Sequence, residues 1–186
     1  MPTYTAQTVH TEKTVTRLAK AQYLAFSAGV RFAVMSLCCL LLMLALFGGF
    51  SRGITILLLA LGCLPLAALN QPARQMAESA LRQLAGSYPT NDFVFTAEGM
   101  KVQNGQRSET VAYREIVRLV SEDEYAYLFL RNHAGYMVAL ATLHPADRDA
   151  FRRDVARWAG LEWTKNRGVL GVSLKSLRLS RKNTRK

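Results

Sequence analysis

Residues 36–69 read SLCCLLLMLALFGGFSRGITILLLALGCLPLAAL, and this stretch decides the fold of the chain. It carries a single charge, Arg52, and divides at Gly48 to Gly53. Before the division, residues 32–50 are uncharged and span about 28 Å as a helix, against a hydrocarbon core of about 30 Å. After it, residues 54–69 are uncharged and span about 24 Å, which is enough where the bilayer thins locally.

Two other interpretations of this stretch fit less well. The core helix of a soluble protein has a polar stripe at helical spacing, and neither half of the stretch has one. A cleaved signal peptide has a short basic leader, whereas thirty-one residues precede the first apolar run here and a second run follows directly. We therefore predict a transmembrane helical hairpin over residues 32–69.

The basic residues around the hairpin predict its orientation. The hairpin loop holds only Arg52, whereas basic residues lie before the first span and after the second: Lys13, Arg17, Lys20, Arg31, Arg74 and Arg82. Because short loops rich in Lys and Arg stay in the cytoplasm, we expect both termini in the cytoplasm and Ser51 outside.

Small residues and a proline inside the spans predict how the helices pack. Ala45, Gly49 and Gly53 recur every four residues, which is typical of close helix approach, although small residues are common in membrane helices. Pro65 removes a backbone donor and is expected to bend the second helix. The cysteines have no histidine or carboxylate beside them to form a metal site, so we expect them to act as small apolar residues: Cys38, Cys39 and Cys63.

Charge is distributed unevenly along the chain. The formal net charge of +11 divides into +5 for residues 1–91, −2 for residues 92–163 and +8 for the tail, residues 164–186. A basic tail on a chain that is tethered to the membrane predicts binding to an anionic leaflet, either as an amphipathic helix or as a disordered segment. Nucleic acid is disfavoured as the partner because the tail past Trp163 has no aromatic side chain for base stacking. The predicted lipid-binding residues are Lys175, Arg178, Arg181, Lys182, Arg185 and Lys186.

The pattern between hairpin and tail predicts an α+β protein. Residues 70–87 show helical spacing and form a connecting helix, and from residue 92 the spacing changes to two, as in strands. We expect a small antiparallel β domain over residues 88–163, closed by an amphipathic helix over residues 145–158. The first segment, residues 1–31, supplies an edge strand at residues 4–9 and an amphipathic helix. The expected strands cover residues 92–96, 100–103, 107–112, 117–122, 125–130 and 136–141, with one helical turn at 113–116.

Several motifs of the β domain carry a family resemblance. Phe93 to Phe95 precede Glu98-Gly99, and Tyr113-Arg-Glu-Ile116 leads into two further strands. With two membrane helices before them, these motifs resemble the YcxB-like family of bacterial membrane proteins over roughly residues 1–163. The resemblance implies a bacterial inner-membrane location and a β domain similar to pleckstrin-homology (PH) domains, in a family whose function is not characterised.

No pattern in the sequence indicates catalysis. His10, His133 and His144 are scattered, with His144 expected at the start of the closing helix, and no phosphate loop, nucleophile elbow or zinc motif is present. The acidic cluster Glu122 to Glu124 is interpreted as a solvated loop, with a cation site or acid pair as the alternative. We predict a protein that is not an enzyme and has no cofactor.

Two functions remain open from the sequence. The first is a membrane-anchored binding module for a protein or lipid ligand at the inner membrane face, with an unknown protein partner. The alternative is a structural or assembly subunit that acts through its transmembrane hairpin. The oligomeric state stays open in both.

Overall fold

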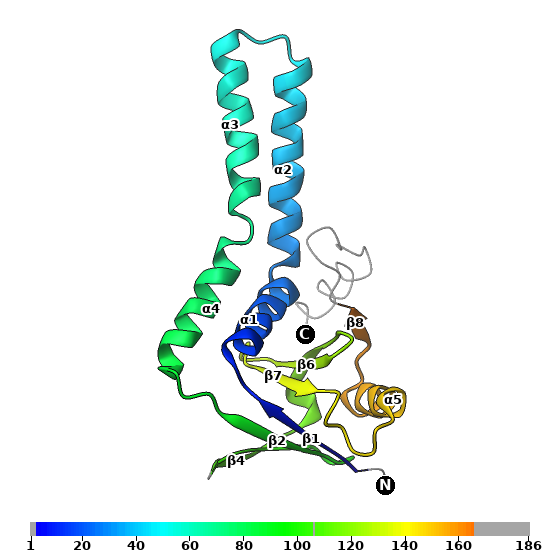
Figure 1. Cartoon of the computed structure of the whole chain (residues 1–186). Helices are drawn as coiled ribbons and strands as arrows, with labels where there is room; N and C mark the ends of the chain where they lie inside the picture. Colours follow the sequence, from blue (N-terminus) through cyan, green and yellow to red (C-terminus); the bar gives the residue numbers. More distant parts are fainter. Residues whose placement is uncertain (1–2, 106, 166–186) are drawn as a thin grey trace.

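The computed structural model describes residues 3–105 and 107–165, and in it a pair of long helices extends from a compact β domain (Figure 1). Four helices dominate the first half: α1 (Glu12–Phe26), α2 (Ala28–Phe47), α3 (Arg52–Ala68) and α4 (Gln71–Leu84). The strands are β1 (Tyr4–Val9), β2 (Thr90–Phe95), β3 (Met100–Asn104), β4 (Arg107–Val111), β5 (Ile116–Ser121), β6 (Tyr125–Leu130), β7 (Gly135–Ala139) and β8 (Trp163–Lys165). The 3₁₀ helix η1 (Tyr113–Glu115) and the helix α5 (Arg148–Ala159) complete the described part.

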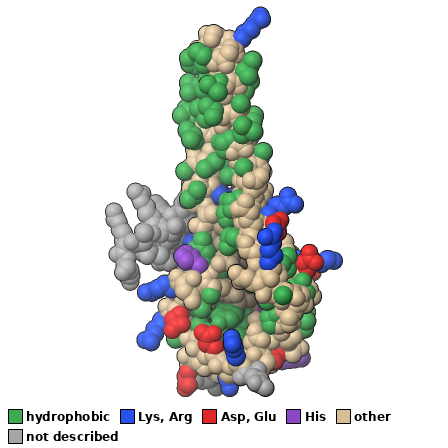
Figure 2. Space-filling model, turned by 90° about the vertical axis from the view of Figure 1, so that its left-hand side faces the viewer, with side chains coloured by type: hydrophobic (Ala, Val, Ile, Leu, Met, Phe, Trp, Pro, Cys, Tyr) green, Lys and Arg blue, Asp and Glu red, His purple; other side chains and the backbone are tan. Residues whose placement is uncertain are grey.

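The helix pair α2–α3 contains the long apolar stretch of residues 36–69. α2 and the helical stretch Arg52–Leu84, which holds α3 and α4, are long and apolar enough to span a membrane. Figure 2 shows apolar side chains over the projecting pair, with a single basic side chain at its far tip and charged side chains of both signs around the β domain. The helix α2 begins at Ala28, four residues before the predicted first span. It ends at Phe47 because Gly48 and Gly49 start the loop.

The two long helices approach each other closely at Gly62, which the sequence pattern did not single out. A Cβ atom placed there would lie 2.9 Å from the side chain of Leu42 and 3.4 Å from the carbonyl oxygen of Cys38. The predicted packing motif is wrong in two of its three positions. Ala45 is buried, but Gly53 faces open space and Gly49 is a loop residue with φ of +63°.

The β domain consists of two four-stranded sheets, in the orders β1-β2-β3-β4 and β7-β6-β5-β8. Their pairs are antiparallel except for β5 with β8, in which Leu119 stands opposite Trp163. The six strands and the short helical turn expected between residues 92 and 141 are confirmed, and β1 pairs with β2 along its whole length. The short parallel strand β8 was not predicted.

The core lies between the inner faces of the sheets and α5. Phe93 and Phe95 stack with centroids 6.1 Å apart, and Phe151 of α5 meets Phe95 edge-on at 5.0 Å. Tyr4 closes this cluster from β1 and donates a hydrogen bond to Asp154 of α5 at 2.7 Å. The N-terminal strand and the C-terminal helix are therefore parts of one core.

The closing helix starts later than predicted. Residues 145–147 precede it, because the Asp147 side chain accepts hydrogen bonds from the Asp149 and Ala150 amides and so forms the N-cap. The expectation that His144 starts the helix is wrong. Its backbone exchanges two hydrogen bonds with Thr5 of β1, at 2.7 and 2.8 Å, which fastens this segment to the first sheet.

Candidate functional site

The helix α1 links the long helices to the β domain. It begins with a capping box in which Thr11 and Thr14 satisfy each other's amides. It ends at Phe26, and Ser27 alone separates it from α2. The Ser27 amide donates to the Tyr23 carbonyl and the Arg31 amide donates to the Ser27 carbonyl, so regular backbone bonding continues across the break.

One side of α1 packs on the outer face of the second sheet. Phe26 meets Phe129 of β6 edge-on, with ring centroids 5.7 Å apart, and Phe129 stacks on Tyr127 at 6.3 Å. We call this cluster the α1–sheet interface; its buried members are Ala21, Ala25, Val120, Tyr127, Phe129 and Met137. Because α1 covers one face and the core covers the other, β6 is buried on both faces and reads as the apolar run YAYLFL.

Polar contacts border the α1–sheet interface. Arg17 forms an ion pair with Glu124 and lies 5.5 Å from the centroid of the Tyr125 ring. Arg118 of β5 lies 5.4 Å from the centroid of the Phe26 ring, and burial lowers the pKa of its guanidinium from the ordinary value. The exposed Arg17–Glu124 pair contributes little stability by itself, so the apolar contacts carry most of the attachment.

The acidic turn Glu122 to Glu124 joins β5 to β6. Asp123 and Glu124 are exposed, as the interpretation of a solvated loop expects, and the turn also contacts α5. Arg152 of α5 donates to the Glu122 carbonyl at 3.2 Å, and Arg148 donates to the Asp123 carbonyl at 3.4 Å. The Tyr127 hydroxyl donates to the Glu122 carboxylate at 2.9 Å, and burial together with that carboxylate raises the pKa of Tyr127. Within residues 3–105 and 107–165, no three His, Cys, Asp or Glu side chains are grouped to hold a metal ion.

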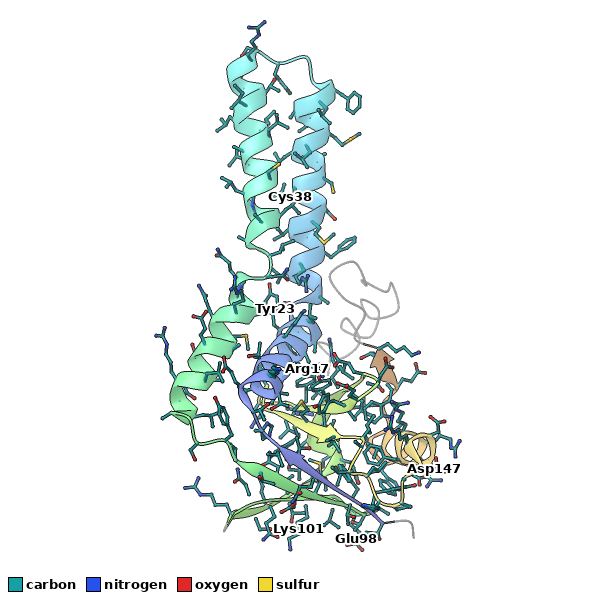
Figure 3. The ribbon with its side chains drawn as sticks, viewed as in Figure 1. Arg17, Tyr23, Cys38, Glu98, Lys101 and Asp147 are labelled. Carbon is teal, nitrogen blue, oxygen red and sulfur yellow. The ribbon has the colours of Figure 1, made fainter. Side chains whose placement is uncertain are left out.

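A buried arginine lies where α1, α2 and the end of α3 meet. The Tyr23 hydroxyl of α1 donates to the carbonyl oxygen of Leu69 at 2.9 Å, and Figure 3 shows Tyr23 at this junction. The Arg31 guanidinium carbon lies 5.7 Å from the centroid of the Tyr23 ring. Arg31 is 4% exposed, and its Nη2 is enclosed without an acceptor among the described residues. We call Tyr23, Arg31 and Leu69 the junction site.

The junction site was not predicted from the sequence, where Arg31 served only as a marker of orientation. A signal for it exists in the sequence. No Asp or Glu occurs between Glu12 and Glu78, so neither long helix offers a carboxylate partner to an arginine in its first turn.

A second buried polar pair fastens the start of α1 to β2. Asn91 and His10 side chains lie 3.0 Å apart, and the His10 Nδ1 and Asn91 Oδ1 atoms are enclosed without partners in the described structure. Burial lowers the pKa of the His10 imidazole from its ordinary value, so it is neutral at pH 7.

The strand β4 forms an open edge of the first sheet. It pairs with β3 on one side, and residues 107–110 are exposed. Among the described residues, Arg107–Val111 make no backbone hydrogen bonds except those with β3. Such an edge offers unpaired amide and carbonyl groups to an added strand.

The lipid-binding residues predicted for the tail lie outside the described residues: Lys175, Arg178, Arg181, Lys182, Arg185 and Lys186. Comparison with protein-family models, with curated proteins and with solved structures finds no match to this chain. The geometry described above is therefore the basis for assigning a function.

Proposed function

We propose that this chain is a membrane-anchored binding protein of the bacterial inner membrane, with both termini in the cytoplasm. Its hairpin α2–α3 crosses the bilayer, and its β domain is a PH-like module, as in YcxB-like proteins. The module binds a protein or lipid ligand at the inner membrane face and performs no catalysis.

The observation that carries this proposal is the attachment of α1. A single residue separates α1 from α2, while Phe26 and the buried members of the α1–sheet interface hold α1 against the second sheet. A domain attached in this way stays at the membrane surface instead of moving freely on a linker. A ligand of the domain is then met at the membrane face.

The open edge of β4 supports a protein segment as the ligand. An extended peptide can add to a free sheet edge through main-chain hydrogen bonds, with specificity from alternate side chains. β4 presents both charge signs through Arg107 and Glu109, so a peptide of mixed polarity fits it better than an apolar one.

The topology is tested by cysteine labelling. In a chain whose native cysteines are replaced by alanine, Ser51→Cys and Ser108→Cys supply one thiol each in the hairpin loop and on β4. A membrane-impermeant maleimide is expected to label Ser51→Cys in intact spheroplasts, and Ser108→Cys only after the membrane is permeabilised. Labelling of Ser108→Cys in intact spheroplasts overturns the orientation.

The site of ligand capture separates the binding module from an assembly subunit. A photo-crosslinking amino acid at Ser108 or Thr110 reports on the β4 edge, and one at Leu40 or Leu46 reports on the exposed face of α2. A binding module gives one defined adduct from the β4 positions and only lipid adducts from α2. Defined protein adducts from α2 alone favour the assembly role.

A further inference from the structure

The junction site holds a charged side chain for which the described chain supplies no counter-ion. Arg31 is 4% exposed and makes no ion pair or side-chain hydrogen bond with the described residues, and its Nη2 is enclosed. We infer that Arg31 binds the phosphate group of a phospholipid in the inner leaflet. This inference rests on the proposed function, because it requires α2 and α3 to lie in the bilayer.

The missing counter-ion separates Arg31 from the three arginines that form ion pairs in the described chain. Arg17, Arg152 and Arg157 each pair with a carboxylate on the β domain or on α5. Around Arg31, no acidic residue occurs anywhere between Glu12 and Glu78. A buried charge without a partner is strongly unfavourable, so an anion from outside the helices is the group that completes the site.

The depth of Arg31 fits a lipid phosphate. It lies in the first turn of α2, and the uncharged run from Phe32 to Phe50 follows it directly. With that run in the hydrocarbon core, the guanidinium lies at the boundary where the phosphate groups of the leaflet are found. Arg52, in contrast, lies at the opposite end of the helix pair.

Tyr23 arranges the site before a ligand arrives. Its ring lies beside the guanidinium, and its hydroxyl is fixed on the Leu69 carbonyl at 2.9 Å. Nη2 is enclosed without an acceptor, while Nε and Nη1, which have no acceptor among the described residues either, are not fully enclosed. A guanidinium presents donors in a fixed fork that matches phosphate oxygens. The small exposure restricts the site to a single phosphate group.

The test uses the full chain, extracted in a mild detergent and stripped of lipid. Short-chain phosphatidylglycerol is titrated into the wild type and into Arg31→Gln, Arg31→Lys, Arg52→Gln and Arg74→Gln, and binding is measured by native mass spectrometry. We expect Arg31→Gln to bind about 10- to 100-fold more weakly, because it loses a charge-assisted contact. Arg31→Lys should lie between it and the wild type, and the Arg52 and Arg74 variants should bind as the wild type does.

Two further arms separate the possible failures. If wild-type protein stays in carbonate-washed membranes but Arg31→Gln binds lipid like the wild type, the lipid site is refuted and membrane anchoring stands. If carbonate releases the wild type, membrane anchoring itself is refuted. Inorganic phosphate should leave the thermal stability of the lipid-free wild type unchanged, whereas the lipid should raise it. An equal rise with both, or none with the lipid, overturns the assignment even where Arg31→Gln does not fold.

Discussion

Replacing Gly135 with alanine should loosen the attachment of α1 to the β domain. Gly135 begins β7, and a Cβ atom there would lie 2.7 and 2.8 Å from two atoms of the Phe129 ring and 3.4 Å from the Leu18 side chain of α1. Ordinary carbon contacts are about 3.5–4.0 Å, so the ring has to move by about 1 Å. It has no free space, because Phe129 is fully buried and Phe26 packs against it.

The expected magnitude follows from the cost of overfilling a packed interior. Such substitutions destabilise by about 1–3 kcal/mol. For a chain of this length, each kcal/mol lowers Tm by about 2–4 °C, so Gly135→Ala should melt about 2–12 °C below the wild type. The assay is thermal unfolding of the full chain in detergent, followed by near-ultraviolet circular dichroism, which reports on aromatic packing.

A matched control and a rescue make the result specific. Gly29, in the first turn of α2, has no neighbouring atom within 4 Å of the position that an added methyl group would take, so Gly29→Ala should not lower Tm. Phe129→Leu should make Gly135→Ala less damaging than it is alone, because the smaller side chain leaves room for the methyl group. If Gly135→Ala melts at or above the wild-type temperature, the close packing of α1 on the sheet is disproved.

Three other perturbations test the β domain. Tyr4→Phe removes a hydrogen bond to the Asp154 carboxylate and should lower the free energy of unfolding, measured by chemical denaturation, by about 1.5–3 kcal/mol. An unchanged free energy of unfolding would mean that β1 is not part of the core. Asp147→Ala removes the N-cap of α5 and should cost about 1 kcal/mol, measured the same way. Burial lowers the pKa of His10 in the folded state, so unfolded chains take up the proton first and stability should fall as the pH drops below 6.5. His10→Gln should reduce this acid sensitivity between pH 7 and pH 5, and an unchanged profile would contradict it.

The local pattern predicted most elements of the fold. The strands of the β domain were found because each hairpin is marked by nearby turn residues, such as Asn104 and Gly105, and because inward and outward residues alternate. The apolar helices could be predicted because their uncharged runs are longer than those in the core helices of soluble proteins. These signals all lie within a short window of sequence.

The features that were missed depend on contacts between distant segments. β8 is three residues long and pairs in parallel with β5. A parallel pair is not joined by a hairpin turn, so no turn residues in the sequence mark this strand. The packing of α1 on β6 appears in the sequence only as an apolar run that fits either one or two covered faces. Arg31 looked like a topology marker because its burial depends on α1 and Leu69, which come from two other segments.

The pairing of β1 with β2 sets an order for making this protein. Tyr4 stands opposite Phe95, so the first sheet joins segments that are made before and after both long helices. During synthesis the first strand leaves the ribosome early and has no partner until the hairpin has been translated. If the hairpin enters the bilayer as it emerges, insertion precedes closure of the sheet, and the finished sheet then links the two ends of the hairpin to each other. In a chain that fails to insert, β1 would stay unpaired with its apolar face exposed. Quality-control proteases would then degrade the chain in that partly folded state.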